Sequence, residues 1–181
     1  AAGLTVTART PGLDTATINL YLDRGVQGII GPHIETVEEA QKLVDSCRFG
    51  PDGARSWGGG RGTFYNDVTS IEDAYNTRLS FMEEANQNIL VVVQLETKKS
   101  FDNIDDILGV SGIDAFTHGP HDLAQSMGFH GDPEHPKVVE AMRGASERIR
   151  RGYGKMWSDI TKVAYAHQLF LSASRNFIKG G

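Results

Sequence analysis

Two acidic side chains follow apolar segments of the sequence and could bind a cation together. Glu96 closes the apolar run 89–93 after Gln94, and Asp122 comes shortly after a second apolar stretch, 113–117. Because side chains alternate along a strand, Gln94 and Glu96 are expected on the same side. Carboxylates at the C-terminal ends of parallel strands lie where α/β proteins keep ligands. Two carboxylates with open coordination positions suit Mg²⁺ or Mn²⁺.

Each of these groups also has a purely structural interpretation. Glu96 could form an ion pair with an arginine at the mouth of the sheet, and Asp122 could cap the turn after Pro120. Arg9 ends the first predicted strand. A guanidinium there could face a carboxylate or a developing oxyanion, or it could form a salt bridge at the rim.

Glycine, proline and histidine follow one another at two predicted strand ends, as far as His33 and as far as His121. Either histidine could be a metal ligand, a general base or a structural residue. The backbone at Gly119 could face an anion or simply form a tight turn. The glycine-rich segment 58–62 lacks the Gly-Lys-Ser/Thr ending of a phosphate-binding loop, and a mobile lid or a subunit contact is the better interpretation.

Composition indicates an ordinary globular protein. The 181 residues suffice for one domain, and 39% are hydrophobic and 23% charged. The net charge of −5 argues against a general nucleic-acid binder. Cys47 is the only cysteine, so no internal disulfide is expected. No apolar stretch approaches the ~20 residues of a membrane span, and the default expectation is a cytoplasmic protein.

Strand-like and helix-like periodicities alternate along the chain, which predicts a parallel sheet. The predicted helices cover 15–24, a segment from Thr36 to about Arg48, Thr69 to about Asn86, 101–108, a short turn after Asp122, 136–151 and 159–167. Six strands are predicted, at 4–9, 26–30, 89–96, 113–118, 155–157 and 168–173. A closed (β/α)8 barrel needs eight strands, typically in ~250 residues. We therefore expect either an open sheet or a barrel whose first two strand-helix units are missing from this chain.

The chain resembles the HpcH/HpaI aldolase family of metal-dependent class II pyruvate aldolases. An ordered series of motifs with family-like spacing carries the resemblance, at Thr7–Pro11, Asp23–Ile30, Thr36–Ala40, Phe49–Arg55, Val92–Thr97, Gly112–Phe116, Gly119–Ala124 and Met127–Pro136. The resemblance implies a single TIM-barrel domain, partial here, over residues 1–181. It also implies an aldolase that reversibly cleaves a 2-keto-4-hydroxy acid to pyruvate and an aldehyde.

The resemblance also implies roles for particular residues. Glu96 and Asp122 would be the ligands of a divalent metal, Mg²⁺ or Mn²⁺, and Arg9 would hold the keto oxygen of pyruvate. Gln94 would contact the site. The backbone around Gly119 and His121 would hold the pyruvate carboxylate. The partners would be a small keto acid and an aldehyde, and the assembly a homo-oligomer.

Departures from the family pattern leave two other functions open. The catalytic histidine of the family and its acidic partner are expected before residue 1. His33 and His121 stand where members usually have apolar or small residues, and the match fades after about Arg151. The alternatives are a CoA-ester lyase of the citrate-lyase-like branch and an inactive relative that binds metal or a keto acid.

Overall fold

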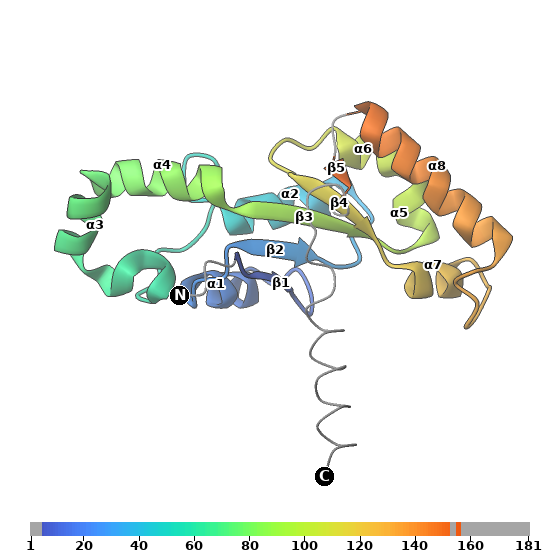
Figure 1. Ribbon diagram of the computed structural model, residues 1–181, viewed down its shortest axis with the longest axis horizontal. Helices are drawn as coiled ribbons and strands as arrows, with labels where there is room; N and C mark the ends of the chain where they lie inside the picture. The colour runs from blue at the N-terminus through green and yellow to red at the C-terminus, as the bar shows by residue number, and fades with distance from the viewer. Residues whose placement is uncertain (1–4, 153–154, 157–181) are drawn as a thin grey trace, which may run out of the picture.

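The computed structural model describes residues 5–152 and 155–156 as one parallel sheet flanked by helices (Figure 1). The sheet has five strands, which are hydrogen-bonded in the order in which they occur along the chain. The strands are β1 (Thr7–Arg9), β2 (Gly28–Gly31), β3 (Leu90–Leu95), β4 (Ala115–His118) and β5 (Lys155–Met156). Every neighbouring pair is parallel.

This sequential strand order matches an arc of a barrel. A doubly wound open sheet reverses its strand order at a switch point, whereas a (β/α)8 barrel adds each new strand beside the previous one. The prediction of a parallel α/β sheet of barrel type is therefore confirmed. The predicted helix 159–167 and strand 168–173 lie outside the described residues.

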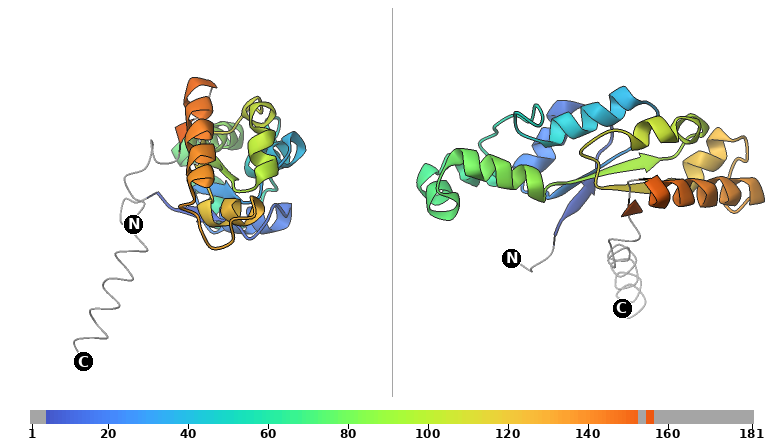
Figure 2. Two further views of the ribbon diagram at one scale, coloured as in Figure 1. Left: turned by 90° about the vertical axis from the view of Figure 1, so that its right-hand side faces the viewer. Right: turned by 90° about the horizontal axis from the view of Figure 1, so that it is seen from above.

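The helices lie between the strands in sequence (Figure 2). They are α1 (Thr15–Asp23), α2 (Val37–Cys47), a 3₁₀ helix η1 (Arg61–Asn66), α3 (Val68–Tyr75), α4 (Arg78–Asn88), α5 (Lys98–Asp102), α6 (Ile104–Leu108), α7 (Pro120–Ser126) and α8 (Pro136–Gly152). Their starts follow local chemistry. Asp14 accepts a hydrogen bond from Thr17 N at 2.8 Å, and Thr36 forms a capping box with Glu39. None of the helices in the described ranges is long and apolar enough to cross a membrane.

The two faces of the sheet carry different side chains. Ile29, Val93 and Leu95 point toward the helices, where they join the main hydrophobic core with residues of α1, α2, α6 and α8. The alternation of a strand directs Arg9 and Gln94 to the opposite face. The strands therefore present the polar groups of the site away from the helical layer.

Three predicted segments have different boundaries in the structure. The helix predicted from Thr69 to Asn86 is broken because Asn76 adopts a left-handed backbone, with φ of 65°, and Thr77 then caps α4. The helix predicted over 101–108 starts earlier, at Lys98, and breaks at Asn103. The segment 50–66, in which neither a helix nor a strand is predicted, contains η1.

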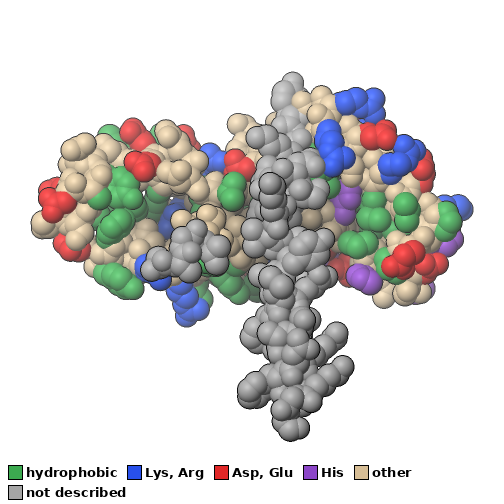
Figure 3. Space-filling model, in the orientation of Figure 1, with side chains coloured by type: hydrophobic (Ala, Val, Ile, Leu, Met, Phe, Trp, Pro, Cys, Tyr) green, Lys and Arg blue, Asp and Glu red, His purple; other side chains and the backbone are tan. Residues whose placement is uncertain are grey.

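The helices α3 and α4 project from the body of the molecule and have a small core of their own (Figure 1). Phe49, Ile71 and Phe81 are buried there, and the Phe81 ring lies 5.6 Å from the Trp57 ring between centroids. Hydrophobic side chains show at this end in Figure 3, whereas side chains of both charges cover α8. On α8, Arg143 pairs with Glu140 and Glu147.

The side chain of His118 lies on the helical side of β4 and packs against Phe101, with ring centroids 5.5 Å apart. Its Nε2 atom is buried without a hydrogen-bond partner among the described residues. Burial, with the charge of Arg150 as a smaller cause, lowers the pKa of His118 to about 4. The histidine is thus held neutral by the core.

Replacing His118 with Phe should flatten the acid dependence of stability. A neutral buried histidine stabilises the fold fully above its unfolded pKa of about 6.5, and this contribution is lost progressively as the pH falls toward 4. Urea unfolding at pH 7, 5.5 and 4.5 should show a shallower loss of unfolding free energy in His118→Phe than in the natural protein. Equal slopes would mean that His118 is accessible to protons in the folded state.

Candidate metal and anion site

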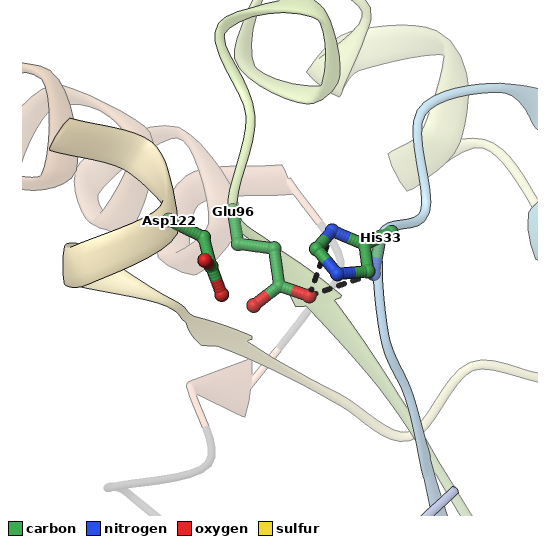
Figure 4. Close-up of side chains that lie close together, drawn as sticks. All are labelled: His33, Glu96 and Asp122. Atoms are coloured by element: carbon green, nitrogen blue, oxygen red, sulfur yellow. Dashed lines mark hydrogen bonds and ion pairs between the residues drawn. The ribbon is translucent and has the colours of Figure 1, made fainter. Parts of the chain in front are cut away.

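Polar side chains at or after the C-terminal ends of four parallel strands meet at one edge of the sheet. Figure 4 shows three of them, His33, Glu96 and Asp122. Arg9 ends β1, His33 follows β2, Glu96 follows β3, and Asp122 lies in the first turn of α7. One ligand atom each from His33, Glu96 and Asp122 lies within 4.8 Å of the other two. Figure 4 shows Glu96 between Asp122 and His33. The two carboxylates expected to meet at this edge therefore do so.

Glu96 is the buried centre of this group. Its side chain has 0% exposure, and its Oε1 atom accepts a hydrogen bond of 2.8 Å from the backbone N–H of His33. The same oxygen lies 3.7 Å from Arg9 Nη2. The other oxygen, Oε2, is buried with no hydrogen-bond partner among the described residues. Glu96 thus forms the ion pair with an arginine that its structural interpretation predicts. This ion pair involves Oε1 only, and Oε2 remains without a partner in the described part of the chain.

Burial raises the pKa of the Glu96 carboxyl above its usual value. The nearby negative charge of Asp122 acts in the same direction, while the His33 N–H and the charges of His33 and Arg9 oppose it. The fold therefore makes the ionised form of Glu96 less favourable than that of a solvent-exposed glutamate. A cation beside Oε2 would remove this cost.

Arg9 is oriented by Gln94. The guanidinium donates from Nε to Gln94 Oε1 at 3.0 Å, and 47% of the Arg9 side chain remains exposed. The register explains the contact, because Arg9 is level with Ile30 and Val92 and Gln94 is two residues further along the same face. The side-chain amide of Gln94 thus holds the guanidinium of Arg9 beside Glu96. The other N–H groups of the guanidinium remain available to a ligand.

Gly119 gives Glu96 its space. A Cβ atom at this position would lie 2.6 Å from Glu96 Cβ and 3.0 Å from Gln94 Nε2, and closer still to Glu96 Oε2. The Gly119 N–H donates to the carbonyl of Leu95 at 3.0 Å. Glycine is therefore required at position 119 because any side chain there would collide with Glu96. The N–H group of Gly119 is already hydrogen-bonded within the fold.

Asp122 and His121 occupy the exposed start of α7. The N-cap residue of α7 is Gly119, and the helix has no side-chain capping bond. The alternative interpretation, in which Asp122 caps the turn after Pro120, is therefore wrong. The carboxylate of Asp122 lies at the cluster with Glu96 instead.

The donor set fits a divalent cation. Two carboxylates, one exposed and one with an unsatisfied buried oxygen, are the kind of donors that a hard cation takes. The sequence predicts a metal at Glu96 and Asp122, and it leaves His33 open between metal ligand, general base and structural residue. The position of His33 directly after a proline at a predicted strand end marks it as a candidate site residue. That position does not show that His33 contacts Glu96.

Fold and site together define an α/β barrel-type protein with a candidate cation site at the C-terminal ends of its strands. The family model described as HpcH/HpaI aldolase/citrate lyase matches residues 1–181. The chain belongs to the HpcH/HpaI aldolase/citrate lyase family.

Named relatives agree with this membership. The chain is similar to a 4-hydroxy-2-oxovalerate aldolase of Rhodococcus jostii (strain RHA1), with 35% identity over 173 residues that cover 96% of this chain and 63% of that enzyme. It is also similar to a 4-hydroxy-2-oxo-heptane-1,7-dioate aldolase of Shigella flexneri, with 33% identity over 137 residues that cover 76% of this chain and 48% of that enzyme. The chain thus spans about half to two thirds of the length of these relatives.

Solved structures show the same fold. The crystal structure of an HpcH/HpaI aldolase from Desulfitobacterium hafniense superposes with a TM-score of 0.70 at 28% identity, covering 98% of this chain and 73% of that one. The described sheet therefore corresponds to part of the fold of that aldolase.

Replacing Gly119 with Ala should destabilise the protein by about 1–3 kcal/mol, the usual cost of overpacking. The new methyl group would displace the Glu96 carboxylate. Gly144→Ala in α8 is the matched control, because a Cβ there meets nothing within 4 Å and should stabilise the helix by roughly 0.5–1 kcal/mol. Denaturant unfolding of both variants checks this, and a neutral Gly119→Ala would contradict the tight packing of Glu96.

Proposed function

We propose that this chain forms the metal- and pyruvate-binding part of an aldolase that reversibly cleaves a 2-keto-4-hydroxy acid to pyruvate and an aldehyde. The observation that carries the proposal is the meeting of Asp122 and Arg9 at the buried carboxylate of Glu96, one oxygen of which has no partner among the described residues. The aldolase names of the similar proteins support this reaction over that of a CoA-ester lyase.

Glu96 and Asp122 would hold the divalent cation, with Mg²⁺ and Mn²⁺ the expected ions. When bound, such a cation supplies Lewis-acid polarisation of the keto group of the substrate. The chain contributes the negative charge that would retain the ion, and one of the contributing oxygens, Glu96 Oε2, is buried. Ionised Glu96 is costly on its own, which favours occupancy of the site.

Arg9 would stabilise the charge that develops at the keto oxygen. In the cleavage direction the C4 hydroxyl loses its proton and the C3–C4 bond breaks. The electron pair of that bond passes through C2 to the keto oxygen, and C3 is then protonated to give pyruvate. The guanidinium that Gln94 holds at 3.0 Å adds positive charge where this negative charge appears.

The first turn of α7 would receive the pyruvate carboxylate. Pro120 has no N–H and the Gly119 N–H is bound to Leu95, so the donors left in this turn are the N–H groups of His121 and Asp122. Backbone donors at a helix start suit an anionic group. His121 would thus serve through its backbone, and its side chain would remain exposed.

Glu96→Gln should abolish metal-dependent exchange of the pyruvate C3 protons. The substitution keeps the shape of the side chain and removes the charge that would retain the cation. Proton NMR of pyruvate in deuterated buffer, with the intact protein and either Mn²⁺ or EDTA, measures the exchange. Glu140→Gln on the surface of α8 is the matched control and should exchange at the natural rate. Undiminished exchange in Glu96→Gln would refute the metal assignment, and no exchange in the natural protein would favour an inactive binding relative.

Arg9→Lys should lower the exchange rate by about 10²–10³-fold, the usual cost of losing one charge-stabilising donor. Lysine keeps the positive charge but loses the planar fork that contacts Gln94. Arg143→Lys on α8 has the same chemical change at an exposed ion pair and should leave the rate unaltered. Equal rates for the two lysine variants would exclude Arg9 from the reaction.

A further inference from the structure

His33 is held against the metal site by an uncommon backbone conformation. Its φ is 50°, in the left-handed region that residues other than glycine seldom adopt, although histidine does so more often than most. This conformation presents two groups of one residue to the same oxygen. The backbone N–H donates to Glu96 Oε1 at 2.8 Å, and ring atom Nδ1 lies 3.3 Å from that oxygen.

The distances in the cluster are compatible with a shared ion. Neighbouring ligands on an octahedral ion with bonds of ~2.1–2.2 Å are about 3 Å apart, and opposite ligands about 4.4 Å apart. One ligand atom from each of His33, Glu96 and Asp122 lies within 4.8 Å of the other two, close to the larger of these separations.

A second observation points to a ligand at this place. Glu96 is fully buried, and its Oε2 atom has no partner among the described residues. The imidazole of His33, by contrast, is 55% exposed at the edge of the cluster. The fold thus places an unsatisfied anionic oxygen and an accessible imidazole in one cluster.

We propose that His33 is a third protein ligand, so that the site binds its cation through two carboxylates and one imidazole. This inference rests on the proposed metal site and adds to it a nitrogen donor. Imidazole suits first-row transition metals, whereas Mg²⁺ takes oxygen ligands. The site should therefore select Mn²⁺, or a later ion such as Co²⁺, over Mg²⁺.

Pulsed EPR of bound Mn²⁺ tests the nitrogen ligand without any need for activity. The intact natural protein should show ¹⁴N coupling to Mn²⁺, and labelling with ¹⁵N-histidine should convert it to ¹⁵N coupling. His33→Asn should lose this coupling, because asparagine tolerates the left-handed backbone but has no imidazole. His121→Ala should keep it, since that histidine lies outside the cluster.

Competition between Mn²⁺ and Mg²⁺ tests the selectivity. His33→Asn should reduce the ratio of the Mn²⁺ affinity to the Mg²⁺ affinity by at least about tenfold. Loss of even an indirect partner of a metal ligand costs about 10–100-fold in metal affinity, and the imidazole contributes more to the binding of Mn²⁺ than to that of Mg²⁺. Circular dichroism of the variant confirms that it is folded.

The outcomes separate this inference from the proposed function. Mn²⁺ bound without histidine coupling would overturn the His33 ligand and leave the two-carboxylate site intact. If the ¹⁴N coupling is lost in His121→Ala and kept in His33→Asn, His121 is the nitrogen ligand and the proposal for His33 is wrong. No Mn²⁺ binding in the natural protein would overturn both proposals.

Discussion

The site depends on one buried carboxylate that the protein alone does not satisfy. Glu96 has no exposed surface, one oxygen is held by the His33 N–H, and the other has no partner among the described residues. A buried ionised group costs free energy unless a charge or hydrogen bonds compensate it. The carboxylate therefore favours a cation, and its surroundings determine which cation and which substrate can approach.

The architecture fixes this carboxylate through register and space. The parallel strands end at a common edge, and the alternation along β3 points Gln94 and Glu96 away from the helical core. Gly119, on the next connection, leaves the volume that Glu96 fills. Arg9 reaches the site from β1 because Gln94 holds its guanidinium. The residues that pack the end of the sheet are thus also the residues that form the candidate site.

The sequence could predict the parts of this arrangement that follow from local patterns. The apolar run before Glu96 predicts a buried strand, and the Thr36 capping box predicts the start of α2; both are found. The break at Asn76 was not predicted: asparagine adopts a positive φ more readily than most residues, but nothing in the local sequence requires it to do so there. The ring of His33 beside Glu96 likewise depends on a backbone conformation that its neighbours in sequence do not specify.

The central claim is that a divalent ion binds at Glu96 and Asp122. Anomalous X-ray diffraction from crystals of the intact protein grown with Mn²⁺ tests it most directly. The account predicts an anomalous peak within coordination distance of Glu96 Oε2 and of the Asp122 carboxylate. Well-ordered crystals with both side chains visible and no peak between them would contradict it.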